Sequence, residues 1–370
     1  MRERTSKKLV WHFIAGCAVF LGAVALLVYF VDPFFHYHKP WFGLKPLQYS
    51  HQYQAYGAVE HLDYDSLLLG SSVVMSINTD TLDNRLDCVT IKGVGNSASA
   101  PLLEKYLETS FEHHELKHVF YGLDVFSLYM TTAEDNLFPE EVRYLVNKNP
   151  FDDVQYLWNG TIIGEKIPDM LLASRADGFS YGLAYQINHQ GDCNPDVVLE
   201  NYNPTIDEVV YEEHDIYYGS EQVTANLDRI EQFVIDHPET EFDFFLPPYC
   251  ITWWYRAYNQ HLLDSYLYTL GQSMERLLAH ENVHFYTTDF NNEDVITNLY
   301  LYQDVAHGGV TVTEQMAQEI CNPDYEITLD TYQDELNHLN QILTQFRKRA
   351  ETEGIGFVYD GPIRLVEQDD

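Results

Sequence analysis

Five short apolar segments, with helical patterns between several of them, constrain the fold of this chain more than any other feature. They are residues 66–71, 89–94, 118–125, 242–247 and 283–288. Apolar runs of this length are typical of strands that are buried on both faces of a parallel sheet. Helical patterns occur at 100–112, 224–235 and 262–279, and two more follow at 313–320 and 332–353. The alternation predicts crossover connections, and therefore a three-layer α/β/α fold with a mostly parallel, five-stranded sheet.

A serine pair follows the first predicted strand. The sequence Leu-Leu-Leu-Gly-Ser-Ser ends at Ser72, so a buried strand stops at a tight turn that carries a hydroxyl. Active sites of open parallel sheets lie beyond the carboxyl ends of their strands. The N-terminus of a following helix would also favour developing negative charge. Ser72 is therefore the candidate nucleophile, and the alternative is that these serines only cap the next helix.

An Asp-x-x-His sequence further along the chain supplies partners for this serine. Asp304 precedes His307 by three residues, a spacing that can place both side chains on one short turn. A serine hydroxyl is a weak nucleophile until a base accepts its proton, and a carboxylate can orient that base. The sequence therefore predicts a Ser72, His307 and Asp304 triad in a serine hydrolase or acyltransferase. A surface loop ahead of a helix is the competing interpretation.

The chain order of serine, aspartate and histidine, with the last two almost adjacent, resembles the SGNH/GDSL hydrolase-like superfamily. With the N-terminal apolar run described below, the chain resembles the membrane-anchored branch, which contains DltD-like teichoic-acid D-alanylation proteins and alginate O-acetylation proteins. The resemblance implies a flavodoxin-like SGNH fold. It also implies that Ser72 is the first-block serine and that Asp304 and His307 form the last block.

The resemblance further implies an oxyanion hole. Its second-block glycine corresponds to Gly95, which follows the second predicted strand. The third block of the typical enzymes is Gly-x-Asn-Asp, but the corresponding residues here are Gly122-Leu123-Asp124, without the asparagine. Asn96 or a backbone N–H is expected to replace that donor. Loss of one oxyanion donor costs on the order of 3 kcal/mol, so the replacement matters for activity.

Aromatic residues after the fourth predicted strand are candidates for substrate binding. The strand ends in two prolines, and Tyr249, Trp253 and Trp254 follow. The resemblance places such a strand end near the site, together with Asp124 at the end of the third strand. An exposed aromatic cluster would suit stacking on sugars. Ordinary core packing is the alternative, because large aromatic side chains are mostly buried.

A long apolar segment near the N-terminus predicts a membrane anchor. Residues 9–31 are apolar and follow a tail at 1–8 that contains four basic residues. About 23 residues are enough to cross a bilayer as a helix, and the basic tail should stay in the cytoplasm. A cleaved signal peptide is the alternative, but the bulky residues at 28–35 make a poor cleavage site.

The predicted organisation after the anchor has two parts. Residues 32–65 form a juxtamembrane stalk that ends in an amphipathic helix at 52–62, and residues 66–370 form the extracytoplasmic SGNH-like domain. Inside that domain, residues 127–219 are too long for a simple loop. They are predicted to form a mostly helical cap beside the site.

Composition excludes several classes of function. Asp and Glu number 57 against 21 Lys and Arg, which gives a formal charge of −36. Nucleic-acid binding needs clustered basic residues, so it is excluded. The five cysteines are scattered and predict neither a zinc site nor a definite disulfide. The histidines at 36, 38, 113 and 114 are poorly spaced for one ion, and no metal or cofactor is expected.

These observations predict a membrane-tethered, extracytoplasmic serine esterase or O-acyltransferase. Its expected substrate is a cell-envelope glycopolymer, either a polysaccharide or a teichoic-acid-like polymer, and a membrane-bound acyltransferase is an expected partner. The first alternative is a non-catalytic scaffold or polymer-binding partner of such an acyltransferase, which the missing third-block asparagine supports. The second is a secreted lipase-like enzyme, which would require cleavage near residue 31.

Overall fold

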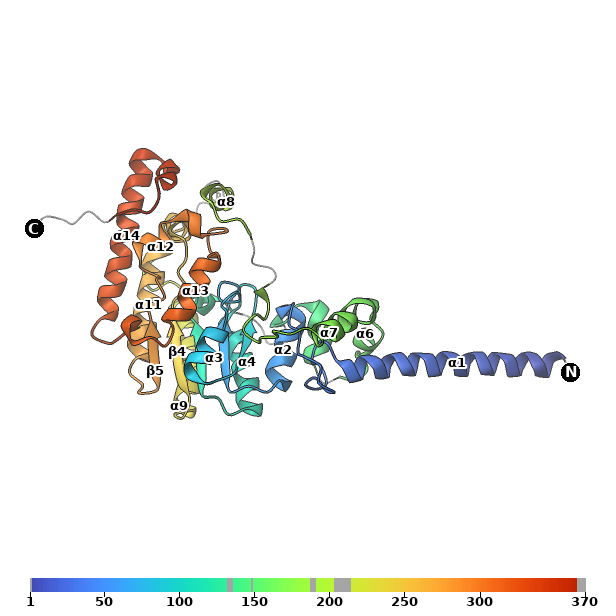
Figure 1. The fold of residues 1–370 in the computed structure, drawn as a ribbon. Helices are drawn as coiled ribbons and strands as arrows, with labels where there is room; N and C mark the ends of the chain where they lie inside the picture. The colour runs from blue at the N-terminus through green and yellow to red at the C-terminus, as the bar shows by residue number, and fades with distance from the viewer. Residues whose placement is uncertain (1, 132–135, 148, 187–190, 203–213, 365–370) are drawn as a thin grey trace, which may run out of the picture. The chain divides into compact units, whose positions relative to one another are not determined.

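The computed structural model describes residues 2–131, 136–147, 149–186, 191–202 and 214–364 (Figure 1). The chain divides into two compact units. The N-terminal unit comprises Met1–Asp63 and Phe138–Ser180, and the sheet unit comprises Tyr64–Leu137 and Tyr181–Asp370. Of the predicted stalk at 32–65, residues 32–63 belong to the N-terminal unit and Tyr64 and Asp65 to the sheet unit. The predicted cap at 127–219 is divided between the two units, and its residues 132–135, 148, 187–190 and 203–213 lie outside the described residues.

The sheet unit is an α/β structure around a six-stranded mixed sheet with the strand order β2-β1-β3-β4-β5-β6. The strands are β1 Ser66–Gly70, β2 Thr90–Val94, β3 His118–Gly122, β4 Glu241–Phe245, β5 Val283–Tyr286 and β6 Glu326–Ile327. The first five strands are parallel, whereas β6 pairs antiparallel with β5. The α/β class and all five predicted strands are confirmed. The predicted strand number was wrong, because a two-residue edge strand leaves no periodic pattern in the sequence.

Helices cover both faces of this sheet. Neighbouring strand residues point to opposite faces, so Phe242 and Asp243 mark the two sides. The Phe242 ring lies 6.3 Å from Phe111 of α4 (Ala100–His113), and Phe111 stacks on Phe233 of α9 (Ser220–Asp236) at 6.1 Å. The opposite face carries Asp243, which contacts Cys321 just beyond α13 (Val310–Glu319). The strands are therefore buried on both sides, which explains their continuous apolar sequences.

The α-helices of the sheet unit are α3 Asp80–Leu86, α4 Ala100–His113, α8 Pro195–Asn201, α9 Ser220–Asp236, α10 Ile251–Asn259, α11 Leu263–Leu277, α12 Glu293–Ile296, α13 Val310–Glu319 and α14 Tyr332–Glu353. The five helices predicted for the sheet unit are confirmed to within four residues at each end, as α4, α9, α11, α13 and α14, whereas α3, α8, α10 and α12 were not predicted. The 3-10 helices are η1 Val125–Tyr129, η7 Leu299–Leu301, η8 Pro323–Tyr325 and η9 Ile355–Asp360.

The N-terminal unit is built around the apolar helix α1, Arg2–Val31. Its segment Lys7–Val31 is long and apolar enough to cross a membrane, by length and composition. The unit also contains α2 His51–His61, η3 Glu140–Val142, α5 Arg143–Val146, α6 Val154–Leu157, the π-helix η4 Ile162–Lys166 and α7 Ile167–Ala173.

A buried aspartate ends α1 and turns the chain. Asp32 adopts a left-handed backbone conformation with φ 44°. Its carboxylate accepts backbone N–H groups from His36, Tyr37 and His38 at 2.7–3.0 Å, and the Tyr156 hydroxyl at 2.7 Å. Residues 32–38 therefore fold back and join the segment that contains Tyr156, which holds α1 firmly in this unit.

Candidate active site

The turn that carries Ser72 depends on two glycines. At Gly70, where φ is 153°, a Cβ would lie 2.6 Å from a methyl group of Val74. At Gly122, at the end of β3, a Cβ would lie 2.6 Å from the other Val74 methyl group. Only glycine at both positions lets the turn after Ser72 pack directly on β1 and β3. The Gly-Ser-Ser sequence therefore places a half-buried serine at the carboxyl end of the sheet.

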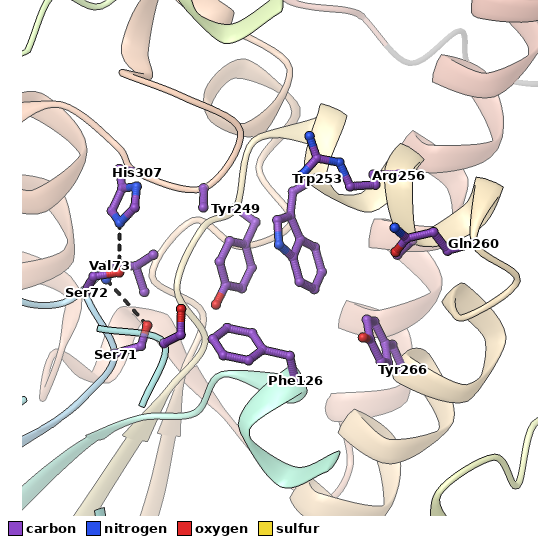
Figure 2. A pocket seen from close by; sticks show the side chains of 13 residues that line it. Ser71, Ser72, Val73, Phe126, Tyr249, Trp253, Arg256, Gln260, Tyr266 and His307 are labelled. Carbon is purple, nitrogen blue, oxygen red and sulfur yellow. Dashed lines mark hydrogen bonds between the residues drawn. The ribbon is translucent and has the colours of Figure 1, made fainter. Parts of the chain in front are cut away.

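The three predicted triad residues lie in one hydrogen-bonded chain. The Ser72 Oγ is 2.8 Å from His307 Nε2 (Figure 2), and His307 Nδ1 is 2.7 Å from Asp304 Oδ2. With Nδ1 donating to the carboxylate, Nε2 presents its lone pair to the Ser72 hydroxyl and can accept the proton. This is the geometry that a nucleophile, a base and an orienting carboxylate require.

A short backbone loop holds the histidine and the aspartate. The Gln303 N–H donates to the His307 carbonyl at 2.9 Å, and Tyr302 pairs with Gly308 across the loop. The buried Tyr302 hydroxyl donates to the Pro248 carbonyl at 2.8 Å. The loop is therefore closed on itself and tied to the segment that follows β4.

The Asp304 carboxylate is organised by several donors. Its Oδ1 accepts the backbone N–H groups of Ala306 at 2.7 Å and His307 at 2.8 Å, while Oδ2 faces the imidazole. Burial raises the pKa of Asp304, but the hydrogen bonds and the charge of His307 outweigh burial and hold the pKa below its usual range. The lowered pKa keeps the Asp304 carboxylate ionised, so it can accept the Nδ1–H of His307.

A pocket of about 380 Å³ opens beside Ser72 (Figure 2). Aromatic side chains form much of its wall: Tyr249 and Trp253 stack at 4.3 Å between ring centroids, and Trp253 and Tyr266 at 5.8 Å. Arg256 adds a positive charge. The lining residues are Ser71, Ser72, Val73, Ser97, Phe126, Tyr249, Trp253, Arg256, Ala257, Gln260, Tyr266, Ala306 and His307.

Asp124 is not part of this pocket, contrary to the prediction that it binds substrate. It is fully buried, and its Oδ2 accepts the Ser71 backbone N–H at 3.1 Å while Oδ1 accepts the Tyr249 hydroxyl. Burial raises the pKa of Asp124 to about 6, even though these two hydrogen bonds oppose the change. Asp124 thus connects the nucleophile turn to the pocket wall from behind.

Trp254 also lies away from the pocket, whereas Trp253 lines it. Trp254 is only 3% exposed. Adjacent residues on a helix point about 100° apart, so α10 can present only one of the two rings to the pocket. The prediction that both tryptophans bind substrate was therefore wrong for Trp254.

Neither residue predicted for the oxyanion hole lines the pocket. The Gly95 N–H donates to the Gly70 carbonyl at 3.3 Å, and Asn96 is exposed. The next residue, Ser97, has φ 45° and does line the pocket. Within the described part of the chain, the Ser72 backbone N–H has no protein acceptor. The Ser72 N–H and Ser97, which both belong to the pocket lining, are therefore the candidate oxyanion donors.

Sequence reasoning missed several pocket residues, and only some of them could have been found. Trp253, Arg256, Ala257 and Gln260 have the spacing of one helical face, so an exposed Trp253 predicts the other three. Ser97, Phe126 and Tyr266 come from separate loops and helices. No sequence spacing connects these three with the nucleophile.

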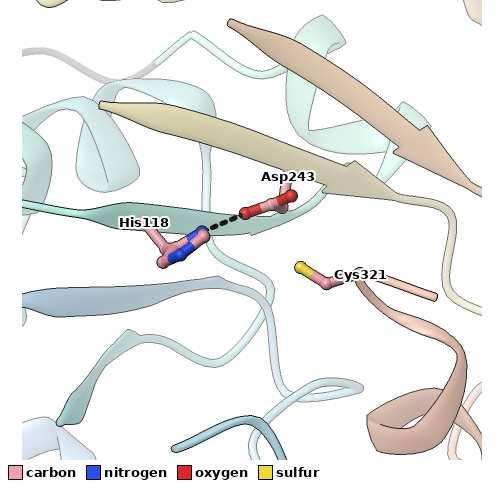
Figure 3. Close-up of side chains that lie close together, drawn as sticks. All are labelled: His118, Asp243 and Cys321. Carbon is pink, nitrogen blue, oxygen red and sulfur yellow. Dashed lines mark hydrogen bonds and ion pairs between the residues drawn. The ribbon is translucent and has the colours of Figure 1, made fainter. Parts of the chain in front are cut away.

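A second cluster of side chains lies on the sheet away from this pocket. The ligand atoms of His118, Asp243 and Cys321 lie within 4.8 Å of one another (Figure 3). His118 Nδ1 is 2.8 Å from Asp243 Oδ2, and the Tyr286 hydroxyl donates to Oδ1 at 3.2 Å. These contacts compensate the charge of a buried carboxylate within the protein, and we assign the cluster a structural role.

No protein-family model and no curated protein matches the chain, so these comparisons identify neither a family nor a function for the site.

Proposed function

We propose that the protein is a membrane-anchored serine esterase or O-acyltransferase of the SGNH hydrolase-like type that acts on an acylated cell-envelope glycopolymer. The observation that carries the proposal is the unbroken chain of hydrogen bonds from Ser72 through His307 to Asp304. The helix α1 is the proposed anchor, with the sheet unit on the extracytoplasmic side.

In the proposed first step, Ser72 attacks the acyl carbonyl of the substrate while His307 Nε2 takes the hydroxyl proton. Asp304 stabilises the resulting imidazolium. The Ser72 N–H and Ser97 are the proposed donors to the oxyanion. His307 then returns the proton to the leaving alcohol oxygen, and the acyl group stays on Ser72 as an ester.

In the second step, His307 takes a proton from the acceptor. Water as the acceptor releases a carboxylic acid, whereas a polymer hydroxyl as the acceptor forms a new ester. Both routes return the proton to Ser72 and restore the enzyme. Exclusion of water from the acyl-enzyme decides between hydrolysis and transfer.

The pocket composition supports a saccharide substrate. Stacked Tyr249, Trp253 and Tyr266 provide flat apolar faces, and the polar side chains of Arg256 and Gln260 also line the pocket. Pyranose rings present apolar C–H faces and polar edges, so they match such a wall. The Arg256 guanidinium uses one donor on the Asn201 carbonyl at 2.8 Å, which leaves further donors for a substrate.

A non-catalytic scaffold is the second candidate function. The engaged Gly95 N–H and the outward position of Asn96 favour it, because the predicted oxyanion donors do not line the pocket. A polymer could then bind along the aromatic wall without reaction. The two candidates differ in one measurable property, which is the reactivity of the Ser72 hydroxyl.

The test is labelling of the full-length protein in detergent with a fluorophosphonate, followed by peptide mass spectrometry. We expect one adduct on Ser72, which is lost in His307→Ala. The matched control is Ser71→Ala, which removes the neighbouring hydroxyl and should keep the Ser72 adduct. An unlabelled protein that is correctly folded by circular dichroism would reject the esterase and leave the scaffold.

A further inference from the structure

The N-terminal unit presents an apolar surface beside α1. Five large apolar side chains of residues 151–172 are exposed to between 39% and 85%: Phe151, Val154, Trp158, Leu171 and Leu172. Phe151, Val154 and Trp158 follow a helical spacing of three and four residues, so they share one side of α6 and of the turn before it. We call these five residues the lobe surface. Water is an unfavourable neighbour for such a cluster.

A hydrogen bond fixes the depth of this surface along α1. The Trp158 Nε1–H donates to the Leu21 carbonyl at 3.0 Å, and α6 packs against α1. Leu21 precedes the last residue of α1 by ten positions, which corresponds to about 15 Å along a helix axis. Trp158 therefore lies beside the middle of α1 and not beside its end.

The depth of Leu21 in a bilayer follows from the length of α1. The apolar residues 9–31 form a helix of about 35 Å, and the hydrocarbon layer is about 30 Å thick. A membrane-spanning α1 must keep nearly all of this segment in hydrocarbon, so Leu21 lies about 10–15 Å inside it. An indole N–H at that depth needs a protein acceptor, and the Leu21 carbonyl supplies one.

We propose that the lobe surface inserts into the half of the bilayer at the C-terminal end of α1. Its exposed side chains continue the exposed apolar surface of α1, where Phe20 is 68% and Leu26 57% exposed. The inference rests on the proposed membrane anchoring, but it does not depend on catalysis.

Charged residues of the same segment limit how deeply the lobe surface inserts and determine which lipid headgroups it tolerates. Glu165 and Asp169 of the same segment are exposed, and such carboxylates must stay among the headgroups. Residues 151–175 contain four acidic and two basic residues, so anionic lipid would repel this segment. Insertion is therefore driven by apolar contact, and uncharged phosphatidylcholine is sufficient for it.

The experiment uses the full chain in nanodiscs of phosphatidylcholine whose acyl chains carry bromine, which quenches nearby tryptophan fluorescence. A new tryptophan is introduced at Phe151→Trp, and the matched control is Ile235→Trp on α9, an apolar site that is 52% exposed in the sheet unit. We expect the brominated lipid to remove most of the added emission at 151. Aqueous iodide should instead quench the added emission at 235.

Leu172→Trp repeats the measurement if Phe151→Trp does not fold. Added emission that iodide quenches at 151 and 172 as strongly as at 235 would overturn the inference, because the lobe surface would then lie in water. Failure of the anchor itself is distinguishable, since the whole chain would then separate from lipid vesicles on flotation. The fluorophosphonate result does not enter either outcome.

Discussion

The two sides of Ser72 are organised to different degrees. On the base side, His307 and Asp304 are joined by hydrogen bonds of 2.7–2.8 Å, and the aspartate also accepts two backbone N–H groups. On the opposite side, where an oxyanion would be bound, the Gly95 N–H donates to the Gly70 carbonyl, and Asn96 is exposed and does not line the pocket. The proton transfer that we propose is thus preorganised, whereas the proposed charge stabilisation depends on residues that the superfamily resemblance does not identify.

The largest predicted effect comes from a substitution on the side of Ser72 that carries His307 and Asp304. Asp304→Asn should lower kcat for ester cleavage by about 10⁴-fold, because the imidazole loses the acceptor that fixes its tautomer. The fold should be unchanged, since the amide oxygen of the substituted side chain can still accept the two backbone N–H groups of the loop. A loss below tenfold in steady-state assays would show that Asp304 does not set the tautomer of His307.

The second prediction sharpens the description of the oxyanion side. Ser97→Ala should lower kcat by about 10²-fold if Ser97 holds the oxyanion, which corresponds to roughly 3 kcal/mol. Asn96→Ala is the matched control and should leave kcat nearly unchanged. The reverse order of the two effects would restore the predicted role of Asn96.

The third prediction concerns the carboxyl behind the nucleophile turn. The pKa of Asp124 rises from 3.8 to about 6 on folding. The folded protein therefore holds this proton more tightly, which contributes stability below pH 3.8 that is lost as the pH rises through 6. Complete ionisation of Asp124 lowers the free energy of unfolding by about 3 kcal/mol.

Asp124→Asn should abolish this contribution because the amide does not titrate. The free energy of unfolding of the wild type, measured relative to Asp124→Asn, should fall between about pH 4 and pH 7. A constant difference across that range would mean that Asp124 is ionised at both pH values.

The smallest predicted effect compares the two tryptophans of α10. Trp253→Ala should raise KM for an acylated oligosaccharide about tenfold, equivalent to the loss of roughly 1.4 kcal/mol of stacking. Trp254→Ala should instead destabilise the fold by about 3–5 kcal/mol, because its side chain is buried. Equal KM values for wild type and Trp253→Ala would show that the Trp253 ring does not contribute to substrate binding.

Sequence reasoning succeeded where the relevant physics is local. The five parallel strands follow from apolar runs, and the Asp304–His307 pair follows from a three-residue spacing. It failed where the outcome depends on packing. The direction of Trp254, the burial of Asp124 and the place of Ser97 in the pocket wall depend on contacts between distant elements. The edge strand β6 is too short to have a pattern, and the packing of residues 138–180 with 1–63 leaves no periodic signal.

The closed loop that carries Asp304 and His307 has a consequence for how such a site is lost in evolution. The dyad is a local module, because backbone hydrogen bonds within a few residues maintain it. The position of the nucleophile is instead a property of the whole sheet, since it requires glycine at both Gly70 and Gly122. A descendant that gains a side chain at either glycine would displace its serine while its Asp-x-x-His sequence remains intact. In descendants of this protein, the glycine pair is therefore a better marker of the retained Ser72–His307 geometry than the histidine motif.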